Sequence, residues 1–121
     1  MRKVGETLAY LRKEKGLGQK QLAALLNMSV GTVSNYENGV HSPDLLTLCR
    51  LTKFFNVTTD YLLGRTEYRC PPEVLDRYIT TDYTMQDMVN TVLSMDSSSQ
   101  ISVINFINYM KSISDSSSDQ N

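Results

Sequence analysis

The stretch "QKQLAALLNMSVGTVSNYENG", residues 19–39, carries two short helical patterns separated by a turn. Leu22 and Leu26 recur at helical spacing in the first pattern, and Val33 and Tyr36 do so in the second. Two short helices joined in this way form a helix-turn-helix, a geometry that many small helical proteins contain. The motif alone therefore does not indicate a function. The residues at the ends of the two helices and around them have to be considered as well.

Both helices have recognisable ends. Gly18 is a tolerable N-cap for the first helix, and Ser29 is a good N-cap for the second. Asn38-Gly39 predicts the end of the second helix, since glycine adopts the left-handed conformation that follows many helices. On the second helix, Gly31 and Ser34 lie roughly opposite the inward-facing residues by the period of 3.6 residues per turn. The outer face of this helix is therefore polar but uncharged.

Three further helices complete the first half of the sequence. Val4, Leu8 and Leu11 form one apolar stripe ahead of the motif. After it, Ser42-Pro43 predicts the start of a fourth helix, with serine as the cap and proline at the first helical position. Thr58 predicts the cap of a fifth, short helix. No run alternates with the period of two that a strand requires.

The stretch "LAYLRKEKGLGQKQLAALLNMSVGTVSNYENGVHSPDLLTLCRLTKFFNVTTDYLLG" closely resembles the Cro-type, lambda-repressor-like helix-turn-helix family, also called XRE. The resemblance covers roughly residues 4–64. It rests on Arg-x-x-x-Gly-Leu at 12–17, "QKQLAALL", "SVGTVSNYENG", Pro43, "LTKFFNV" and "DYLLG", with matching spacing over five helices. It implies an all-α fold, with a five-helix lambda-repressor-like DNA-binding domain followed by a small C-terminal helical segment.

The resemblance also implies that residues 29–38 are a recognition helix in the major groove of double-stranded DNA. Asn35 can make a bidentate contact to adenine, and no side chain here can make the bidentate arginine contact to guanine. We therefore expect an A·T-leaning site that is partly read through DNA shape. Val30 is equally compatible with a base contact and with the edge of the core. The positions that match the family's base contacts are Ser29, Val30, Gly31, Thr32, Ser34 and Asn35.

Charge on the first half would hold the DNA phosphates. Gln19 matches a phosphate-binding position of the family, at a helix N-terminus that offers free N–H groups. His41 is also readable as a solvated loop residue, and Asn38 as part of a helix stop. Arg12 and Glu37 match a buried, structural ion pair of the family. The expected phosphate contacts are Gln19, Lys20, Asn38, His41 and Ser42, with Gln19 and Asn38 foremost.

The second half has a different composition. The predicted domains are a helix-turn-helix domain at 1–66, a linker at 67–83 with a short helix from Pro72, a helical hairpin at 84–113 and a disordered tail at 114–121. Thr84 and Asp87 resemble a capping box. The segment "TTDYT" before them is expected to be a loop. Asp96 is expected to cap the last helix.

Two apolar helices with few charges suggest a contact surface, and we expect a homodimer. Two alternatives stay open: the helices pack back onto the first domain, or they bind another protein. The residues expected in the dimer are Met88, Val92, Ile104, Ile107 and Met110.

Charge and composition limit the functional classes. Residues 1–67 hold nine Lys/Arg against six Asp/Glu, a net charge of +3, and residues 68–121 hold three against seven, a net charge of −4. This asymmetry favours a polyanion as the partner of the first half. No segment suits a membrane span or a signal peptide, so we expect a cytoplasmic protein. Cys49 is expected to be buried and Cys70 to lie in a linker.

An enzyme is not expected, because the sequence has one histidine and no recognisable nucleophile, phosphate loop or metal-ligand pattern. No cofactor or metal is expected either. The sequence therefore predicts a sequence-specific DNA-binding regulator of transcription, a repressor that binds an inverted-repeat operator as a dimer. The alternative is an interaction protein of the antitoxin or anti-repressor type, whose C-terminal helices bind a partner while DNA binding is secondary.

Overall fold

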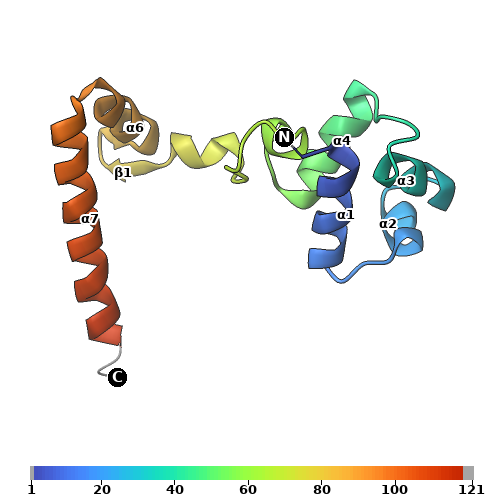
Figure 1. Ribbon diagram of the computed structural model, residues 1–121, viewed down its shortest axis with the longest axis horizontal. Helices are drawn as coiled ribbons and strands as arrows, with labels where there is room; N and C mark the ends of the chain where they lie inside the picture. Colours follow the sequence, from blue (N-terminus) through green and yellow to red (C-terminus); the bar gives the residue numbers. More distant parts are fainter. Residues whose placement is uncertain (1, 119–121) are drawn as a thin grey trace. The chain divides into compact units, whose positions relative to one another are not determined.

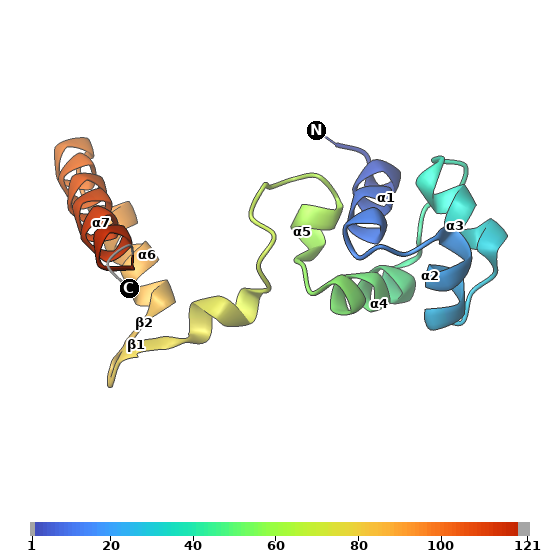
Figure 2. The ribbon, with the colours of Figure 1, turned by 90° about the horizontal axis from the view of Figure 1, so that it is seen from below.

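A computed structural model describes residues 2–118. The chain forms two compact units, one ending at Pro72 and the other beginning at Glu73 (Figures 1 and 2). The predicted boundary of the first domain, at residue 66, falls a few residues before this division. The two units are described separately below.

The first unit consists of the five helices that the sequence predicts. Helix α3 packs against both α1 and α2, and α5 contacts both α1 and α4. Their bounds are α1 Val4–Glu14, α2 Gln19–Leu25, α3 Val30–Glu37, α4 Leu45–Phe55 and α5 Thr59–Leu62. The predicted helix-turn-helix is therefore the pair α2–α3, joined by a turn in which Asn27 has a positive φ of 54°.

The core of the first unit is formed by the apolar stripes of all five helices. Tyr36 was also expected to face inward, but it is only partly buried and, like Leu48, packs against the edge of the core. The buried apolar residues are Leu8, Leu11, Leu22, Ala23, Leu26, Val33, Leu51, Phe55, Val57, Tyr61 and Leu62. This core fixes α3 by one side and leaves its other side facing outward.

Helix caps follow the prediction at two positions and differ at a third. The hydroxyls of Ser29 and Thr58 accept the N–H groups of Thr32 and Tyr61, as N-caps do. The predicted start of α4 at Ser42-Pro43 is wrong. Asp44 caps α4 instead, because its carboxylate accepts the N–H of Thr47 at 2.8 Å. A carboxylate also suits the positive end of the helix dipole.

The chain after α5 does not leave the first unit at once. Arg69 donates two hydrogen bonds to the carboxylate of Glu14 on α1, at 2.6 and 3.1 Å. Its guanidinium also lies 5.5 Å from the centre of the Tyr61 ring, which the Arg2 guanidinium approaches to 4.8 Å. The segment that the sequence reads as the start of a linker is thus fastened to α1 and α5.

A 3-10 helix, η1, at Pro72–Asp76, begins at the last residue of the first unit and leads into the second, where a short helix was expected. The predicted loop before the hairpin is wrong in part, because β1 (Tyr78–Thr80) pairs antiparallel with β2 (Tyr83–Thr84). Tyr78 lies opposite Thr84, and Thr80 lies opposite Tyr83. Strands this short leave no room for the alternating pattern by which a strand is found in a sequence.

Two helices complete the second unit, α6 at Met85–Ser94 and α7 at Ser97–Ser118. Thr84 and Asp87 form the expected capping box, and Asp96 accepts the N–H of Ser99 at 2.7 Å. The predicted disordered tail at 114–121 is wrong for its first part, since α7 continues to Ser118. The rest of that tail, residues 119–121, lies outside the described residues.

The two cysteines lie on the surface. Cys49 was expected to be buried, but both Cys49 and Cys70 are exposed. Cys49 lies on the outward side of α4, whose inner side is filled by Leu51, Thr52 and Phe55.

Between residues 2 and 118, no helix has the length and hydropathy needed to cross a lipid bilayer.

Candidate nucleic-acid interface

The first turn of α3 is fixed by its own hydroxyls. The Ser29 hydroxyl accepts the N–H of Thr32 at 3.1 Å, and the two side-chain oxygens lie 2.7 Å apart in a second hydrogen bond. Val30 and Gly31, between them, are exposed, and Val30 exposes 49% of its surface. The helix therefore presents the methyl groups of Val30 and the backbone at Gly31 beside the two hydrogen-bonded hydroxyls of Ser29 and Thr32.

The middle of α3 carries the group best suited to reading a base. The side-chain amide of Asn35 is half-exposed and has no hydrogen-bond partner in the part of the chain that the structure describes. Ser34, next to it, accepts a hydrogen bond from the side chain of Asn38 at 3.3 Å. An amide with a free donor and a free acceptor can pair with the N6 and N7 edge of adenine.

A buried ion pair holds the C-terminal end of α3. Arg12 on α1 donates to the Glu37 carboxylate through Nε at 2.7 Å and through Nη2 at 3.0 Å. Their side chains are only 10% and 5% exposed, and Arg12 also donates to the Leu17 carbonyl at 2.7 Å. The hydrogen bonds to Glu37 raise the pKa of Arg12, so the guanidinium stays charged. This is the ion pair that the family resemblance implies for Arg12 and Glu37.

The same carboxylate positions Gln19, the first residue of α2. The Gln19 amide Nε2 donates to Glu37 Oε1 at 3.1 Å. A glutamine amide has two N–H groups, so one remains for another acceptor. Gln19, the first residue of α2, is therefore connected to Arg12 through Glu37. The sequence suggested Gln19 and the ion pair separately but not this connection.

Backbone packing brings α1 against the end of α3. A Cβ atom added to Gly5 would lie 2.4 Å from the carbonyl oxygen of Tyr36 and 2.5 Å from that of Glu37. Such contacts leave room for glycine alone at this position. The close approach places the beginning of α1 beside the loop that follows α3.

Positive residues that the sequence did not single out lie near that loop. Arg2 and Lys3 line one hollow together with His41 and Ser42, two of the expected phosphate contacts. Asn38, a third, lines a neighbouring hollow with Lys3, Glu6 and Glu37. Lys20 is exposed on α2. A net positive charge in residues 1–67 was the one signal in the sequence that pointed toward Arg2 and Lys3.

Arg50 is another residue whose role only the structure reveals. It lies on α4, and its guanidinium donates to the Leu26 carbonyl at the end of α2. A cation there satisfies a carbonyl that the helix leaves unpaired and suits the negative end of the helix dipole. Arg50 thus supports the turn between α2 and α3.

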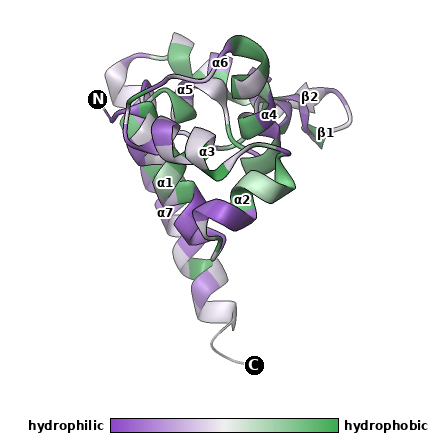
Figure 3. Cartoon of the chain, turned by 90° about the vertical axis from the view of Figure 1, so that its right-hand side faces the viewer, coloured by the Kyte–Doolittle hydropathy of each residue, from purple (hydrophilic) through white to green (hydrophobic). Residues whose placement is uncertain are grey.

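Hydropathy distinguishes the two helices of the motif. Figure 3 shows α3 mostly in pale colours of intermediate hydropathy, whereas α2 has one strongly hydrophilic stretch and one hydrophobic stretch. No group of three or more His, Cys, Asp or Glu residues within 2–118 could hold a metal ion. The exposed surface of α3 is suited to contact through hydroxyls, an amide and methyl groups rather than through charge.

Comparison with known proteins agrees with this geometry. The family model described as Helix-turn-helix matches residues 8–62. An uncharacterized HTH-type transcriptional regulator of Sinorhizobium fredii is 37% identical over 68 residues, which are 55% of this chain and 88% of that protein. The chain belongs to the XRE-type helix-turn-helix family.

Other members of this XRE-type family match this chain over only part of their length. The HTH-type transcriptional regulator ImmR of Bacillus subtilis is 42% identical over 64 residues, or 53% of this chain and 50% of that protein. The match to such curated relatives thus spans about half of their length. A transcriptional regulator from Listeria innocua, whose structure is solved, covers 92% of this chain and 94% of its own at 23% identity and a TM-score of 0.50. That likeness concerns the fold alone.

Proposed function

We propose that this protein is a sequence-specific DNA-binding regulator of transcription, a repressor that binds an inverted-repeat operator as a dimer. The observation that carries the proposal is the free amide of Asn35 on the outer face of α3. The relatives named as HTH-type transcriptional regulators support the class of function. In the motif, the second helix enters the major groove with its N-terminal residues facing the base edges.

The chemistry of α3 favours an A·T-rich site. Asn35 pairs with adenine, and Val30 and Thr32 offer methyl groups to the C5-methyl of thymine. Gly31 lets the backbone approach the groove because glycine has no Cβ atom. The outer face of α3 has no arginine or lysine for the acceptors of guanine, so sequence-dependent shape contributes to recognition.

Contacts to the phosphates surround this face. Gln19 offers its second amide N–H, and Lys20 adds positive charge one residue later. Asn38, His41 and Ser42 follow the recognition helix and lie on exposed positions. These groups set the register of α3 on the duplex, while the bases are distinguished by α3 itself.

Selection of bound DNA from a random library, with the full chain at near-physiological salt, tests the proposal. We expect an enriched A·T-rich inverted repeat whose half-site centres lie about 10 base pairs apart or a multiple of that. Weak binding without any enriched sequence would contradict the proposal. In that case, the protein would be an interaction protein in which DNA binding is secondary.

A further inference from the structure

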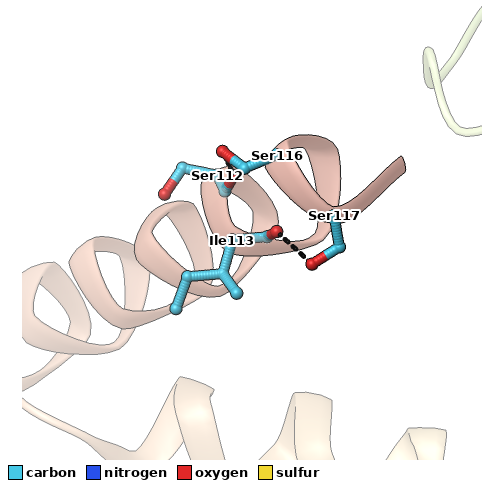
Figure 4. Close-up of a pocket in the computed structure, with 4 residues that line it drawn as sticks. All are labelled: Ser112, Ile113, Ser116 and Ser117. Carbon is cyan, nitrogen blue, oxygen red and sulfur yellow. Dashed lines mark hydrogen bonds between the residues drawn. The ribbon is translucent and has the colours of Figure 1, made fainter. Parts of the chain in front are cut away.

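The hollows on the surface differ in the charge of the residues that line them. One hollow on α7 is lined by Ser112, Ile113, Ser116 and Ser117 (Figure 4). The Ser116 and Ser117 hydroxyls donate to carbonyls of their own helix, at 2.9 and 3.1 Å. No charged side chain is among the described residues that line this hollow, so it offers no attraction to an ionic ligand.

The hollow beside the loop between α3 and α4 has a different character. We call it the N-terminal hollow, because residues 2–5 all line it. It brings Arg2 and Lys3 together with His41 and Ser42, and the remaining described residues that line it are uncharged. A concave surface with charge of one sign concentrates its field on a ligand of the opposite sign. Two cations, an imidazole and a hydroxyl without a carboxylate therefore suit an anion.

Backbone packing holds residues 2–5 in place at both ends. A Cβ atom added to Gly64 would overlap the backbone of Arg2, so the chain passes this point only because glycine is there. At the other end, Gly5 lies directly against the last two carbonyl groups of α3. Lys3 is situated between these two close approaches. It therefore belongs to an ordered segment rather than to a free arm.

The two cations of the N-terminal hollow differ in their own partners. Nη2 of Arg2 lies 3.5 Å from the Glu67 carboxylate, and its guanidinium lies 4.8 Å from the centre of the Tyr61 ring. Lys3 is exposed, and within residues 2–118 its ammonium forms no ion pair with a carboxylate. Arg2 thus anchors the segment to the rest of the unit, while the charge of Lys3 is available to an external anion.

A neighbouring hollow shares Lys3 and contains two carboxylates, those of Glu6 and Glu37. The Glu37 carboxylate is neutralised by its hydrogen bonds to Arg12. Glu6 lies in the first turn of α1 and accepts the backbone N–H of Lys3 at 3.5 Å. A carboxylate there suits the positive end of the helix dipole, but it also repels an anion that approaches Lys3. Glu6 should therefore weaken, without abolishing, the attraction of this site for an anion.

We infer that the N-terminal hollow binds a phosphate of the DNA backbone, with Lys3 as its cation. The inference rests on the proposed function, in which His41 and Ser42 already lie beside the duplex, and it adds a cation from the start of α1. A phosphodiester carries one negative charge on oxygens that accept hydrogen bonds, which matches an ammonium and a hydroxyl. The contact fixes the loop that follows the recognition helix on the backbone of the duplex.

Replacement of single phosphates tests the inference with the full chain. Duplexes that carry the selected site are prepared with one uncharged methylphosphonate at each backbone position in turn. The unsubstituted chain should lose affinity at each phosphate that it contacts, and Lys3→Ala should lose no further affinity at one of these positions. Lys3→Arg should restore the sensitivity there. Lys53→Ala removes another exposed cation, in the last turn of α4, and as the matched control it should keep the full pattern.

A second measurement does not require a selected sequence. On a duplex of unrelated sequence, Lys3→Ala should make the slope of log affinity against log salt shallower by about one unit. Glu6→Gln should raise the affinity, because it removes the opposing charge. Thermal unfolding of each variant checks the fold. Absence of any duplex binding, or equal slopes and equal phosphate patterns for Lys3→Ala and Lys53→Ala, would overturn the inference.

A free phosphate could occupy the same site, and inorganic phosphate distinguishes this case. Saturable binding of inorganic phosphate that Lys3→Ala abolishes, with no effect of Lys3→Ala on duplex binding, would overturn the DNA contact. The two proposals also fail separately. A chain that selects no sequence but shows the slope change at Lys3 refutes the sequence-specific function alone. A chain that selects a site while Lys3→Ala behaves like Lys53→Ala refutes the phosphate contact alone.

Discussion

Arg12 and Glu37 join α1 to α3 through two hydrogen bonds of 2.7 and 3.0 Å, in a site from which water is almost excluded. The pair is bidentate, so it fixes orientation as well as distance. Because Gln19 shares the same carboxylate, the recognition helix and the start of α2 are held by one group. The ion pair is thus a buried part of the fold that also supports the proposed DNA-binding surface.

Loss of one partner of this ion pair should destabilise the first unit strongly. Arg12→Met leaves the Glu37 carboxylate buried without its cation, which costs about 3–5 kcal/mol in comparable pairs. Urea unfolding followed by circular dichroism measures the change in the free energy of unfolding. Arg65→Met is the control, because the exposed Arg65–Asp60 pair spans 3.9 Å and such pairs contribute about 0–1 kcal/mol. Equal effects of the two substitutions would contradict the structural role of Arg12.

Gly31→Ala should separate stability from binding. A Cβ at this position would meet only the Ser29 hydroxyl, at 3.9 Å, so the fold accepts it. Alanine in a helix is more favourable than glycine by up to about 1 kcal/mol, and we expect the free energy of unfolding to rise. DNA affinity should fall, because the added methyl keeps the backbone from the base edges. An unchanged affinity for the selected site would show that Gly31 does not face the groove.

Asn35→Ala should relax the sequence preference at one base pair. Removal of a bidentate amide–adenine contact costs about 1–3 kcal/mol of discrimination against the other bases. Competition binding between the selected site and its single-base variants measures the change position by position. A uniform loss of affinity for every variant would instead make Asn35 a backbone contact. Thermal unfolding of the variant serves as the control for the fold.

Lys20→Ala should change the salt dependence of binding without changing the sequence preference. Each lysine that neutralises a phosphate contributes about one unit to the slope of log affinity against log salt. Titrations between about 50 and about 200 mM salt measure that slope. Lys111→Ala on α7 is the matched control, and its slope should equal that of the unsubstituted chain. An unchanged slope for Lys20→Ala would remove it from the phosphate contacts.

The cap of α4 should make stability depend on pH. The Thr47 N–H and hydroxyl lower the pKa of Asp44. A carboxylate whose pKa is lower in the folded state contributes stability above its unfolded pKa of about 3.9, and that stability is lost as the pH falls through its folded value. Asp44→Asn keeps a capping oxygen without the titration. Its urea midpoint should therefore fall less than that of the unsubstituted chain between about pH 5 and pH 2. Parallel curves would contradict the capping role.

The sequence predicted the first unit well because each helix there has its own apolar stripe and end signal. Ser29, Thr58 and Gly39 mark helix ends through local chemistry that does not depend on the rest of the chain. The cap of α4 was misplaced because Ser42-Pro43 and Asp44 are both plausible beginnings. Only the geometry of the carboxylate at Thr47 distinguishes them.

Contacts between distant segments could not be predicted in the same way. The hydrogen bonds of Arg69 to Glu14 and of Arg50 to the Leu26 carbonyl depend on how the helices pack, and charge patterns alone do not specify them. The β1–β2 hairpin is too short to show a period. For α7, serine-rich composition suggested disorder after residue 113, but the helix that begins at the Asp96 cap continues through it.

The hydrogen bond between Gln19 and Glu37 has a consequence for the thermodynamics of association. A free glutamine side chain loses rotamer entropy when a partner immobilises it, at a cost of about 0.5–1.5 kcal/mol for such side chains at interfaces. Gln19 has lost much of that freedom before any partner arrives, because Glu37 already restrains its amide. The rotamer entropy of Gln19 is therefore lost during folding, and its side chain is already preorganised when the protein binds a polyanion.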